Sequence, residues 1–562
     1  MPAHRLLAHP AAAPIAAFAL ICLMLLPGLG AAPLGKTEGH RALTAHGMVA
    51  SGNWVTPRLF DQLYLRKPPG QYWLVAASES VLGPSEFAWR LPSALATAGV
   101  AAFVAWTARR WFGTPAAGWA AGLSVACLIP LWDQGMTADL DAAHNLAVVV
   151  AAVAFIELVA EPRRRKARWA WTATAALALS AVLLIKVHAG LPLIVGAVLG
   201  SAVATSRWRA FRQPHLYVAL VGALTLPALW AGLLIIDLGG WPSDTRGLRE
   251  AGVPFDALGI VAAFGGGLLA ALLCLLYGLP TTAALPLTIR NARGQWRELP
   301  ILGPLFVAVS SVVPRKRAAY RSAALAVYIA WLIYALFGIT NPRYLYPSLT
   351  LAPLALAGLA DAWQRGLVPA PGQAMGRAVG TLAALGAAVA LVIAAWFLWV
   401  DRTGFPQPAA ATLALLAIGA GLGATVLWLR CRVAAAALAT ALLFAALSIP
   451  VVHWHGVERQ WAWSYTSATT VRSIVPPNEP IAVHDVVWDV PHLLWYADRP
   501  IVSADRPLIG HKRLPDDATW LILSPREARR LLTPDNAPLD ARTHLDPDSH
   551  PSPILVRYDP GS

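Results

Sequence analysis

The stretch AAHNLAVVVAAVAFIELVA at residues 142–160 contains a single charged residue, Glu157. An α-helix of this length rises about 28 Å, which is close to the thickness of the hydrocarbon core of a bilayer. Asp139 and Asp141 precede the stretch, and the basic run Arg163-Arg164-Arg165-Lys166 follows it closely. This arrangement predicts a transmembrane helix that ends on the cytoplasmic side.

The composition of the whole chain has the same character. Of the 562 residues, 57% are hydrophobic and only 13% are charged, and the mean hydropathy is +0.55. Soluble domains are about 25% charged, so the composition excludes an ordinary cytosolic enzyme and indicates an integral membrane protein. The formal net charge of +14 would suggest nucleic-acid binding in a soluble chain, but here it must first be compared with the membrane topology.

Apolar runs of spanning length recur along the chain and predict an all-α polytopic membrane protein with about 13 transmembrane helices. They lie near residues 11–32, 91–108, 115–132, 142–160, 169–186, 189–205, 216–236, 257–280, 322–339, 345–361, 378–400, 408–429 and 433–452. The first run also fits a signal peptide, but the spans that follow favour a transmembrane helix. Residues 301–313 are too short to span and are flanked by Arg and Lys, which predicts an interfacial helix in a cytoplasmic loop.

The distribution of charge tests the orientation of these helices. If the N-terminus is cytoplasmic, the inside loops up to residue 452 hold 22 basic residues and the outside loops hold 11. The acids show the opposite bias, with about 4 inside and 12 outside. This distribution satisfies the positive-inside rule, so the basic surplus reports orientation and is poor evidence for nucleic acid.

Two outside segments are too long to be simple connections. In residues 33–90, a short helix is predicted over Glu38 to Ser51 at the outer membrane surface, with Thr37 as its N-cap and Gly52 as its C-terminal stop. The tail predicts a small C-terminal α/β extracytoplasmic domain, because strand-like and helix-like runs alternate in it. The expected strands are 481–484, 500–503, 520–524 and 554–558, and the expected helices are 490–496 and 525–532. The predicted domains are therefore a transmembrane domain, 1–452, and an extracytoplasmic domain, 453–562.

Charges at the membrane boundary that the positive-inside rule does not require are candidate site residues, because burying a charge is costly. On the outer side they are Glu38, His40, Arg41, Arg66, Lys67, Asp139, Asp141, Lys186, His188, Asp244, Arg246, Arg249, Glu250 and Arg343. A carboxylate in such a group could take a proton from a nucleophile, and the cations could hold a phosphate.

Several motifs follow one another in a fixed order. They are Glu38-Gly39-His40-Arg41, Ser51-Gly52-Asn53-Trp54-Val55-Thr56-Pro57, Lys67-Pro68-Pro69, Ser85-Glu86-Phe87 with Arg90-Leu91-Pro92, Thr137 to Asp141, Lys186 to Pro192, and Asn341-Pro342-Arg343-Tyr344-Leu345-Tyr346-Pro347. This ordered set resembles bacterial glycosyltransferases related to the protein O-mannosyltransferases and the aminoarabinose (lipid A) transferases. The resemblance extends to about residue 360.

The resemblance implies a GT-C fold and a multi-pass protein of the bacterial inner membrane, with a periplasmic C-terminal domain. It implies transfer of a hexose or pentose, with inversion, from an undecaprenyl-phosphate-type donor to an extracytoplasmic acceptor such as lipid A, another glycan or a protein. The expected partners are therefore the lipid-linked donor, the acceptor and the bilayer, and no nucleic acid.

The resemblance also assigns roles to residues. Relatives commonly carry an Asp-Glu pair at the start of the first outer helix, and Thr37 stands at the Asp position here. Threonine cannot act as a base near neutral pH, so Glu38 is the expected catalytic base. A departing polyprenyl phosphate needs cations, which favours Lys67, Lys186 and Arg343 as phosphate ligands. The other expected substrate contacts are His40, Arg41, Asp139, Asp141, His188, Arg249, Glu250, Tyr344 and Tyr346.

Other interpretations stay open at this point. A lipid-linked sugar transporter or flippase would usually show paired repeats, which the sequence lacks, and Thr37 leaves room for an inactive homologue that acts as a scaffold. Glu38 could be a favourable acid at a helix N-terminus, and Lys186 could extend toward the membrane interface. No cofactor is certain, and a divalent metal at Glu38, His40 and His46 is left open, because their spacing is no established ligand set.

Overall fold

The computed structural model describes most of the first 240 residues and shorter segments beyond them. The described residues are 8–30, 32–126, 128–160, 165–186, 189–240, 317–336, 342–365, 462–483, 491–503, 520–523, 542–544 and 553–557. They form two compact units. The first unit comprises residues 1–28, 93–232 and 248–452, and the second comprises residues 29–92, 233–247 and 453–562.

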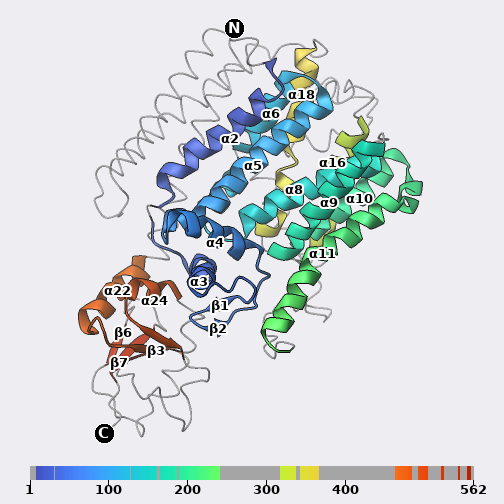
Figure 1. Ribbon diagram of the computed structural model, residues 1–562. Helices are drawn as coiled ribbons and strands as arrows, with labels where there is room; N and C mark the ends of the chain where they lie inside the picture. Colours follow the sequence, from blue (N-terminus) through green and yellow to red (C-terminus); the bar gives the residue numbers. More distant parts are fainter. Residues whose placement is uncertain are drawn as a thin grey trace, which may run out of the picture. The chain divides into compact units, whose positions relative to one another are not determined.

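The first unit is helical throughout its described part (Figure 1). Its elements are α2 (Ala12–Leu25), most of α5 (Glu86–Phe112), α6 (Pro115–Ala126), α7 (Ile129–Gly135), α8 (Asp141–Ala160), α9 (Arg165–Ile185), α10 (Leu191–Thr205), η2 (Trp208–Arg212), most of α11 (Pro214–Asp237), α16 (Arg317–Leu336), η5 (Pro342–Leu345), α17 (Tyr346–Leu349) and α18 (Pro353–Gln364). Five described helices, namely α5, α8, α9, α11 and α16, are long and apolar enough to cross a membrane. This fits the predicted multi-pass membrane protein.

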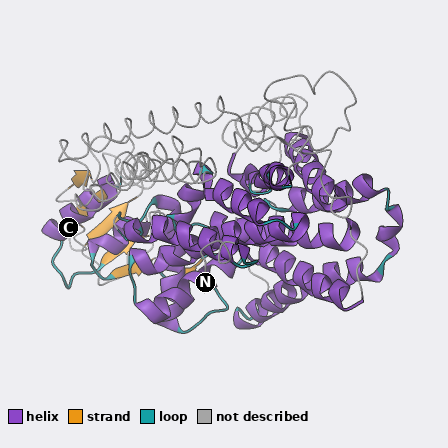
Figure 2. Ribbon diagram, turned by 90° about the horizontal axis from the view of Figure 1, so that it is seen from above, coloured by secondary structure: helices purple, strands orange, loops and turns teal. Residues whose placement is uncertain are grey.

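Helix α8 is the centre of packing in this unit. It contacts α9, α10 and α16, and 89% of the residues in its apolar stretch are buried. A helix that is apolar on all sides lies in a protein core or spans a membrane, and the neighbours of α8 cover nearly all of its Ala, Val, Leu, Ile and Phe side chains. Figure 2 shows the long helices of the unit side by side as a bundle.

Two glycines allow α10 to approach α16 closely. A Cβ atom on Gly196 would overlap the backbone of Ala326, and one on Gly200 would lie 3.0 Å from the Ala326 nitrogen. Small residues at helix crossings in membranes allow such backbone contact, and the van der Waals packing that results stabilises the pair.

We therefore expect Gly196→Ala to lower the free energy of unfolding by about 1–3 kcal/mol, because the methyl group would force the two backbones apart. Gly232→Ala on α11 is the matched control, since nothing lies within 4 Å of the added Cβ. This control should be neutral or stabilising by up to about 1 kcal/mol. Thermal unfolding of the two variants in detergent measures the difference, and equal unfolding temperatures would contradict the close α10–α16 contact.

The second unit combines the first outer segment with the tail. It contains α3 (Lys36–Ser51), the short hairpin β1 (Arg58–Leu59) and β2 (Gln62–Leu63), α4 (Gly70–Leu82), the start of α5, α22 (Ala462–Ile474), α24 (Pro491–Ala497) and a five-stranded sheet. The strands are β3 (Ile481–Val483), β4 (Ile501–Ser503), β5 (Trp520–Leu523), β6 (Arg542–His544) and β7 (Ile554–Arg557), in the order β4-β3-β5-β7-β6. Strand β3 is parallel to β4 and β5, and β7 is antiparallel to β5 and β6. Helix α24 packs against α3, so the tail contacts the first outer helix.

The predicted α/β tail is confirmed in its described part. Four strands lie where the sequence placed them, and the helix expected at 490–496 is α24. Strand β6 was not expected. The expected helix at 525–532 lies outside the described residues, and the division of the chain at residue 452 stays a prediction.

The helix expected over Glu38 to Ser51 is also confirmed, with one correction at its start, and its place at the outer membrane surface stays a prediction. Gly52 ends α3 with a positive φ of 71°, as expected of a C-terminal glycine. The predicted N-cap Thr37 is wrong, because the N-cap is Gly35 and Thr37 lies inside the helix. Glu38, at the third helical position, accepts a hydrogen bond from the Gly35 N–H at 3.0 Å and caps the helix from within.

The expected spans differ from the helices at several places. The run at 115–132 is divided into α6 and α7, and Pro130 lies in the first turn of the second helix, which begins at Ile129. The run at 345–361 is divided among η5, α17 and α18. The span expected at 91–108 is part of α5, which begins earlier, at Glu86, so that Arg90 lies inside the helix. The spans at 257–280, 378–400, 408–429 and 433–452 and the interfacial helix at 301–313 lie outside the described residues, so the total of thirteen stays a prediction.

Candidate active site

In the first unit, Lys186 and Asp141 form a nearly buried ion pair. Asp141 begins α8 and Lys186 directly follows α9. Because the two helices are antiparallel neighbours, these two positions lie at the same end of the helix pair. The Lys186 Nζ lies 2.8 Å from the Asp141 Oδ1, and the two side chains are 9% and 11% exposed. The Lys186 Nζ also lies 4.5 Å from the ring centroid of Tyr344, which is a cation–π distance. The lysine is therefore held between a carboxylate and an aromatic face.

The backbone around Lys186 is fixed by close packing. The Tyr334 hydroxyl of α16 donates a hydrogen bond to the carbonyl oxygen of Ala189. Gly190 leaves no room for a Cβ, because Val148 of α8 would overlap it. These contacts hold the segment after α9 against α8 and limit the positions that the Lys186 side chain can take.

Arg343 forms a second, looser pair beside the first. Its Nη1 lies 3.8 Å from the Asp139 Oδ2, and the Arg343 side chain is 48% exposed. Burial alone would lower the pKa of Arg343, but the carboxylates of Asp141, Asp133 and Asp139 outweigh it and raise this pKa. Arg343 is therefore a stable cation with part of its guanidinium accessible.

The two pairs place two cations and two carboxylates in one region at the ends of α8, α9 and η5. Arginine and lysine donors can bind phosphate oxygens by charge-assisted hydrogen bonds. Arg343 is the more accessible donor, with 48% of its side chain exposed, whereas Lys186 is 9% exposed and paired with Asp141. Of the residues predicted from the sequence, the structure thus brings together Asp139, Asp141, Lys186, Arg343 and Tyr344, with Tyr346 on the adjoining helix.

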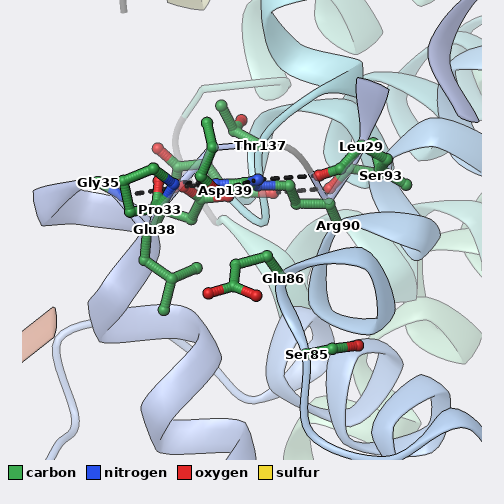
Figure 3. A network of polar contacts seen from close by, with 12 residues as sticks. Leu29, Pro33, Gly35, Glu38, Ser85, Glu86, Arg90, Ser93, Thr137 and Asp139 are labelled. Atoms are coloured by element: carbon green, nitrogen blue, oxygen red, sulfur yellow. Dashed lines mark hydrogen bonds and ion pairs between the residues drawn. The ribbon is translucent and has the colours of Figure 1, made fainter. Parts of the chain in front are cut away.

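In the second unit, Glu38 and Arg90 form a fully buried pair, with exposed fractions of 1% and 2% (Figure 3). The Arg90 Nε donates to the Glu38 Oε1 at 2.5 Å, and its Nη2 donates to the Oε2 at 3.0 Å. The remaining N–H groups of Arg90 donate to the carbonyl oxygens of Leu29, Ala32 and Pro33 at 2.8–3.0 Å. All five donors of the guanidinium are used, so Arg90 fixes the start of the first outer segment to α5.

This arrangement constrains Glu38 as a base. Both carboxylate oxygens accept hydrogen bonds from Arg90, and the Oε2 also accepts from the Gly35 N–H. Because the Glu38 side chain is only 1% exposed, an acceptor can reach it only if this part of the structure opens.

The other predicted residues of this segment lie around Tyr64. Arg41 is buried and its Nη1 donates to the Tyr64 hydroxyl at 2.8 Å. The buried His40 ring is stacked on the Tyr64 ring with centroids 5.7 Å apart. Lys67 is half-buried. His188, Arg249 and Glu250 lie outside the described residues.

Sequence reasoning missed three groups in this unit. Arg90 was quoted as part of a motif but received no role, although a lone arginine near the start of an apolar run needs a buried partner. Glu79 is buried and accepts hydrogen bonds from His46 at 2.6 Å and from the Trp89 Nε1 at 2.7 Å. Tyr496 of the tail accepts from the Leu34 N–H at 2.7 Å and donates to Glu86 at 2.8 Å. Burial and the nearby Glu86 carboxylate raise the pKa of Tyr496, so it stays a neutral donor.

The geometry of the described residues can be compared with that of a metal site. Within them, no three His, Cys, Asp or Glu side chains gather at a distance that could hold a metal ion. Glu38 is paired with Arg90, and His46 is paired with Glu79. The residues considered from the sequence therefore do not converge on one point.

Comparisons with solved structures identify the fold. Over 97% of its length the chain matches the structure of ArnT from Cupriavidus metallidurans bound to undecaprenyl phosphate, with 98% of that chain covered, a TM-score of 0.66 and 19% identity. The apo structure of the same protein matches with a TM-score of 0.66 and 18% identity. The predicted GT-C fold is thus confirmed.

Sequence comparisons point to the same group. Residues 66–230 match the family model described as dolichyl-phosphate-mannose-protein mannosyltransferase. The undecaprenyl phosphate-alpha-4-amino-4-deoxy-L-arabinose arabinosyl transferase of Aeromonas salmonicida is 33% identical over 132 residues, which are 23% of this chain and 24% of that protein. The protein of the same name from Enterobacter sp. is 28% identical over 212 residues, 37% of each chain. The alignments therefore span about a quarter to two fifths of these relatives, and the predicted resemblance is confirmed.

Proposed function

We propose that this chain is a membrane glycosyltransferase that moves a sugar, with inversion, from a polyprenyl-phosphate donor to an extracytoplasmic acceptor. The names of the curated relatives specify an undecaprenyl-phosphate-linked aminoarabinose donor, which makes a pentose donor the first choice over a hexose. Lipid A, another glycan or a protein are the acceptor classes. The proposed location is the bacterial inner membrane, with the N-terminus in the cytoplasm and the tail in the periplasm.

One observation supports the proposal most strongly. Lys186, Arg343 and Tyr344 come together at the ends of α8, α9 and η5, in a fold shared with a protein that binds undecaprenyl phosphate. The positive-inside rule does not require Lys186 or Arg343, and the Arg343 side chain is 48% exposed. A cation site in this position suits the phosphate that leaves when the glycosidic bond to the lipid breaks.

The proposed roles follow the chemistry of displacement. Arg343 and Lys186 hold the leaving phosphate, and Lys67 of the first outer segment is a third phosphate ligand. Asp139, Asp141, Tyr344, Tyr346, His40, Arg41, His188, Arg249 and Glu250 are proposed to orient donor or acceptor. The acceptor hydroxyl must lose its proton as it attacks, and Glu38 is the proposed base once the acceptor shares or displaces one of its donors.

A reconstituted transfer assay tests this function. We expect the full-length protein in nanodiscs to convert undecaprenyl-phosphate-linked aminoarabinose and lipid A into glycosylated lipid A plus undecaprenyl phosphate, both measured by mass spectrometry. The same assay with a hexose-linked donor tests the pentose preference. Movement of labelled donor across vesicles without a covalent product would overturn the proposal in favour of a flippase, and no donor turnover with any acceptor class would favour a scaffold.

A further inference from the structure

A cavity of about 530 Å³ lies at the other end of α8 and α9 from the Lys186–Asp141 pair. It is lined by residues from the end of α8, the start of α9 and the turn η2, namely Leu158, Val159, Arg168, Ser206, Arg207, Trp208, Arg209, Ala210 and Gln213. From Asp141 to Leu158 along α8, the helical rise is about 26 Å. The cavity is therefore almost one hydrocarbon thickness away from the candidate active site, at the opposite membrane boundary.

The charged residues that line this cavity are all positive. Three of the described residues that line it are arginines and none is an acid. Within the described chain, no carboxylate forms an ion pair with Arg168, Arg207 or Arg209. Glu157, which precedes Leu158 on α8, interacts with other residues: the Arg110 Nε lies 3.5 Å from its Oε1, and the Trp111 Nε1 donates to the same oxygen.

The remaining walls suit the boundary between headgroups and acyl chains. Leu158 and Val159 form an apolar side. Trp208 is 57% exposed, and its ring is stacked on Phe211 with centroids 6.1 Å apart. Exposed tryptophans collect at the level of lipid headgroups. A ligand that carries a phosphate on one part and hydrocarbon on another would match both sides of the cavity.

We propose that this cavity binds the phosphate of an anionic lipid headgroup in the leaflet opposite the active site. Basic pockets between transmembrane helices are suited to such headgroups, because guanidinium groups bind phosphate oxygens by charge-assisted hydrogen bonds. Arg207 is partly used by the fold, since its Nη1 donates to the carbonyl oxygen of Ala160 at 2.9 Å. Arg168 and Arg209 are the main phosphate donors. The site does not depend on the glycosyltransferase function.

Lipid binding to the full-length protein in detergent tests the proposal by native mass spectrometry. The probes are phosphatidylglycerol, phosphatidylcholine and inorganic phosphate. We expect phosphatidylglycerol to bind more tightly than phosphatidylcholine, and Arg209→Gln to weaken phosphatidylglycerol binding about tenfold, which corresponds to one charge-assisted hydrogen bond. Arg212→Gln is the matched control, because Arg212 is exposed in the same turn but does not line the cavity. This control should bind phosphatidylglycerol like the wild type.

Several results would overturn the proposal. Equal phosphatidylglycerol affinity in Arg209→Gln, Arg212→Gln and the wild type would show that the arginines serve membrane orientation only. Equal binding of both phospholipids would remove the anionic specificity. Displacement of the lipid by inorganic phosphate at a similar concentration would identify free phosphate as the ligand. Unchanged unfolding temperatures of both variants establish that a loss of binding is local.

Discussion

The Glu38→Gln variant is expected to lose about 3–5 kcal/mol of stability, because Arg90 would keep its charge in a buried site without a carboxylate. The two side chains are 1% and 2% exposed, so water cannot take the place of the missing partner. Arg90→Gln should destabilise the protein by a similar amount, since it removes the charged guanidinium that donates to both oxygens of the buried Glu38 carboxylate. The unfolding temperature in detergent measures both effects.

The double variant Glu38→Gln with Arg90→Gln separates structure from chemistry. Two neutral amides can bond to each other, so we expect this variant to recover about 2 kcal/mol or more relative to the sum of the single changes. An unfolding temperature unchanged in all three variants would contradict the buried pair.

Transfer activity in the same variants tests the proposed base. A double variant that regains stability but transfers no sugar would support a direct role of Glu38 in the reaction. Recovery of transfer together with stability would show that Glu38 only positions the outer segment, and the base proposal would then be wrong. Glu38→Asp is a further control, because it keeps the carboxylate and shifts it by about one methylene.

The sequence could predict those elements whose signal is local. Apolar runs predicted the described spans, and the end of α3 was recognisable from Gly52. Strand β6 gave no such signal, since its three residues, Arg542, Thr543 and His544, have no apolar alternation. It becomes a strand only because β7 offers backbone partners across the sheet.

The site was predictable as a set of charges but not as a set of pairs. Lys186 and Arg343 stood out because the charge rule for loops did not require them. The pairing of Lys186 with Asp141 depends on how α8 and α9 align, which a list of charges does not give. Glu38 and Arg90 are 52 positions apart, and only the fold of the first outer segment brings them together. Sequence reasoning therefore treated Glu38 as available for chemistry and overlooked its buried partner.

The second large effect concerns Lys186, whose replacement by methionine is expected to lower kcat/KM for the donor by about 10²–10³-fold. A preorganised cation at a developing negative charge contributes roughly this much to catalysis. Methionine keeps most of the apolar stem of lysine but ends one atom short of the Nζ, so the charge and its cation–π contact with Tyr344 are both lost. Lys186→Arg should keep part of the activity, because the guanidinium still binds phosphate and Asp141.

A structural role for Lys186 would give a different pattern. Removing Lys186 leaves Asp141 only 11% exposed and without its lysine, which by itself destabilises the protein. The double variant Lys186→Met with Asp141→Asn removes both charges and relieves that cost. If Lys186 holds the leaving phosphate, the double variant regains its unfolding temperature but its kcat/KM stays low, whereas recovery of both would show that the pair serves folding alone. If Lys186 stabilises the departing phosphate in the rate-determining step, the loss should also be larger for donors with poorer leaving groups, which a merely structural pair would not produce.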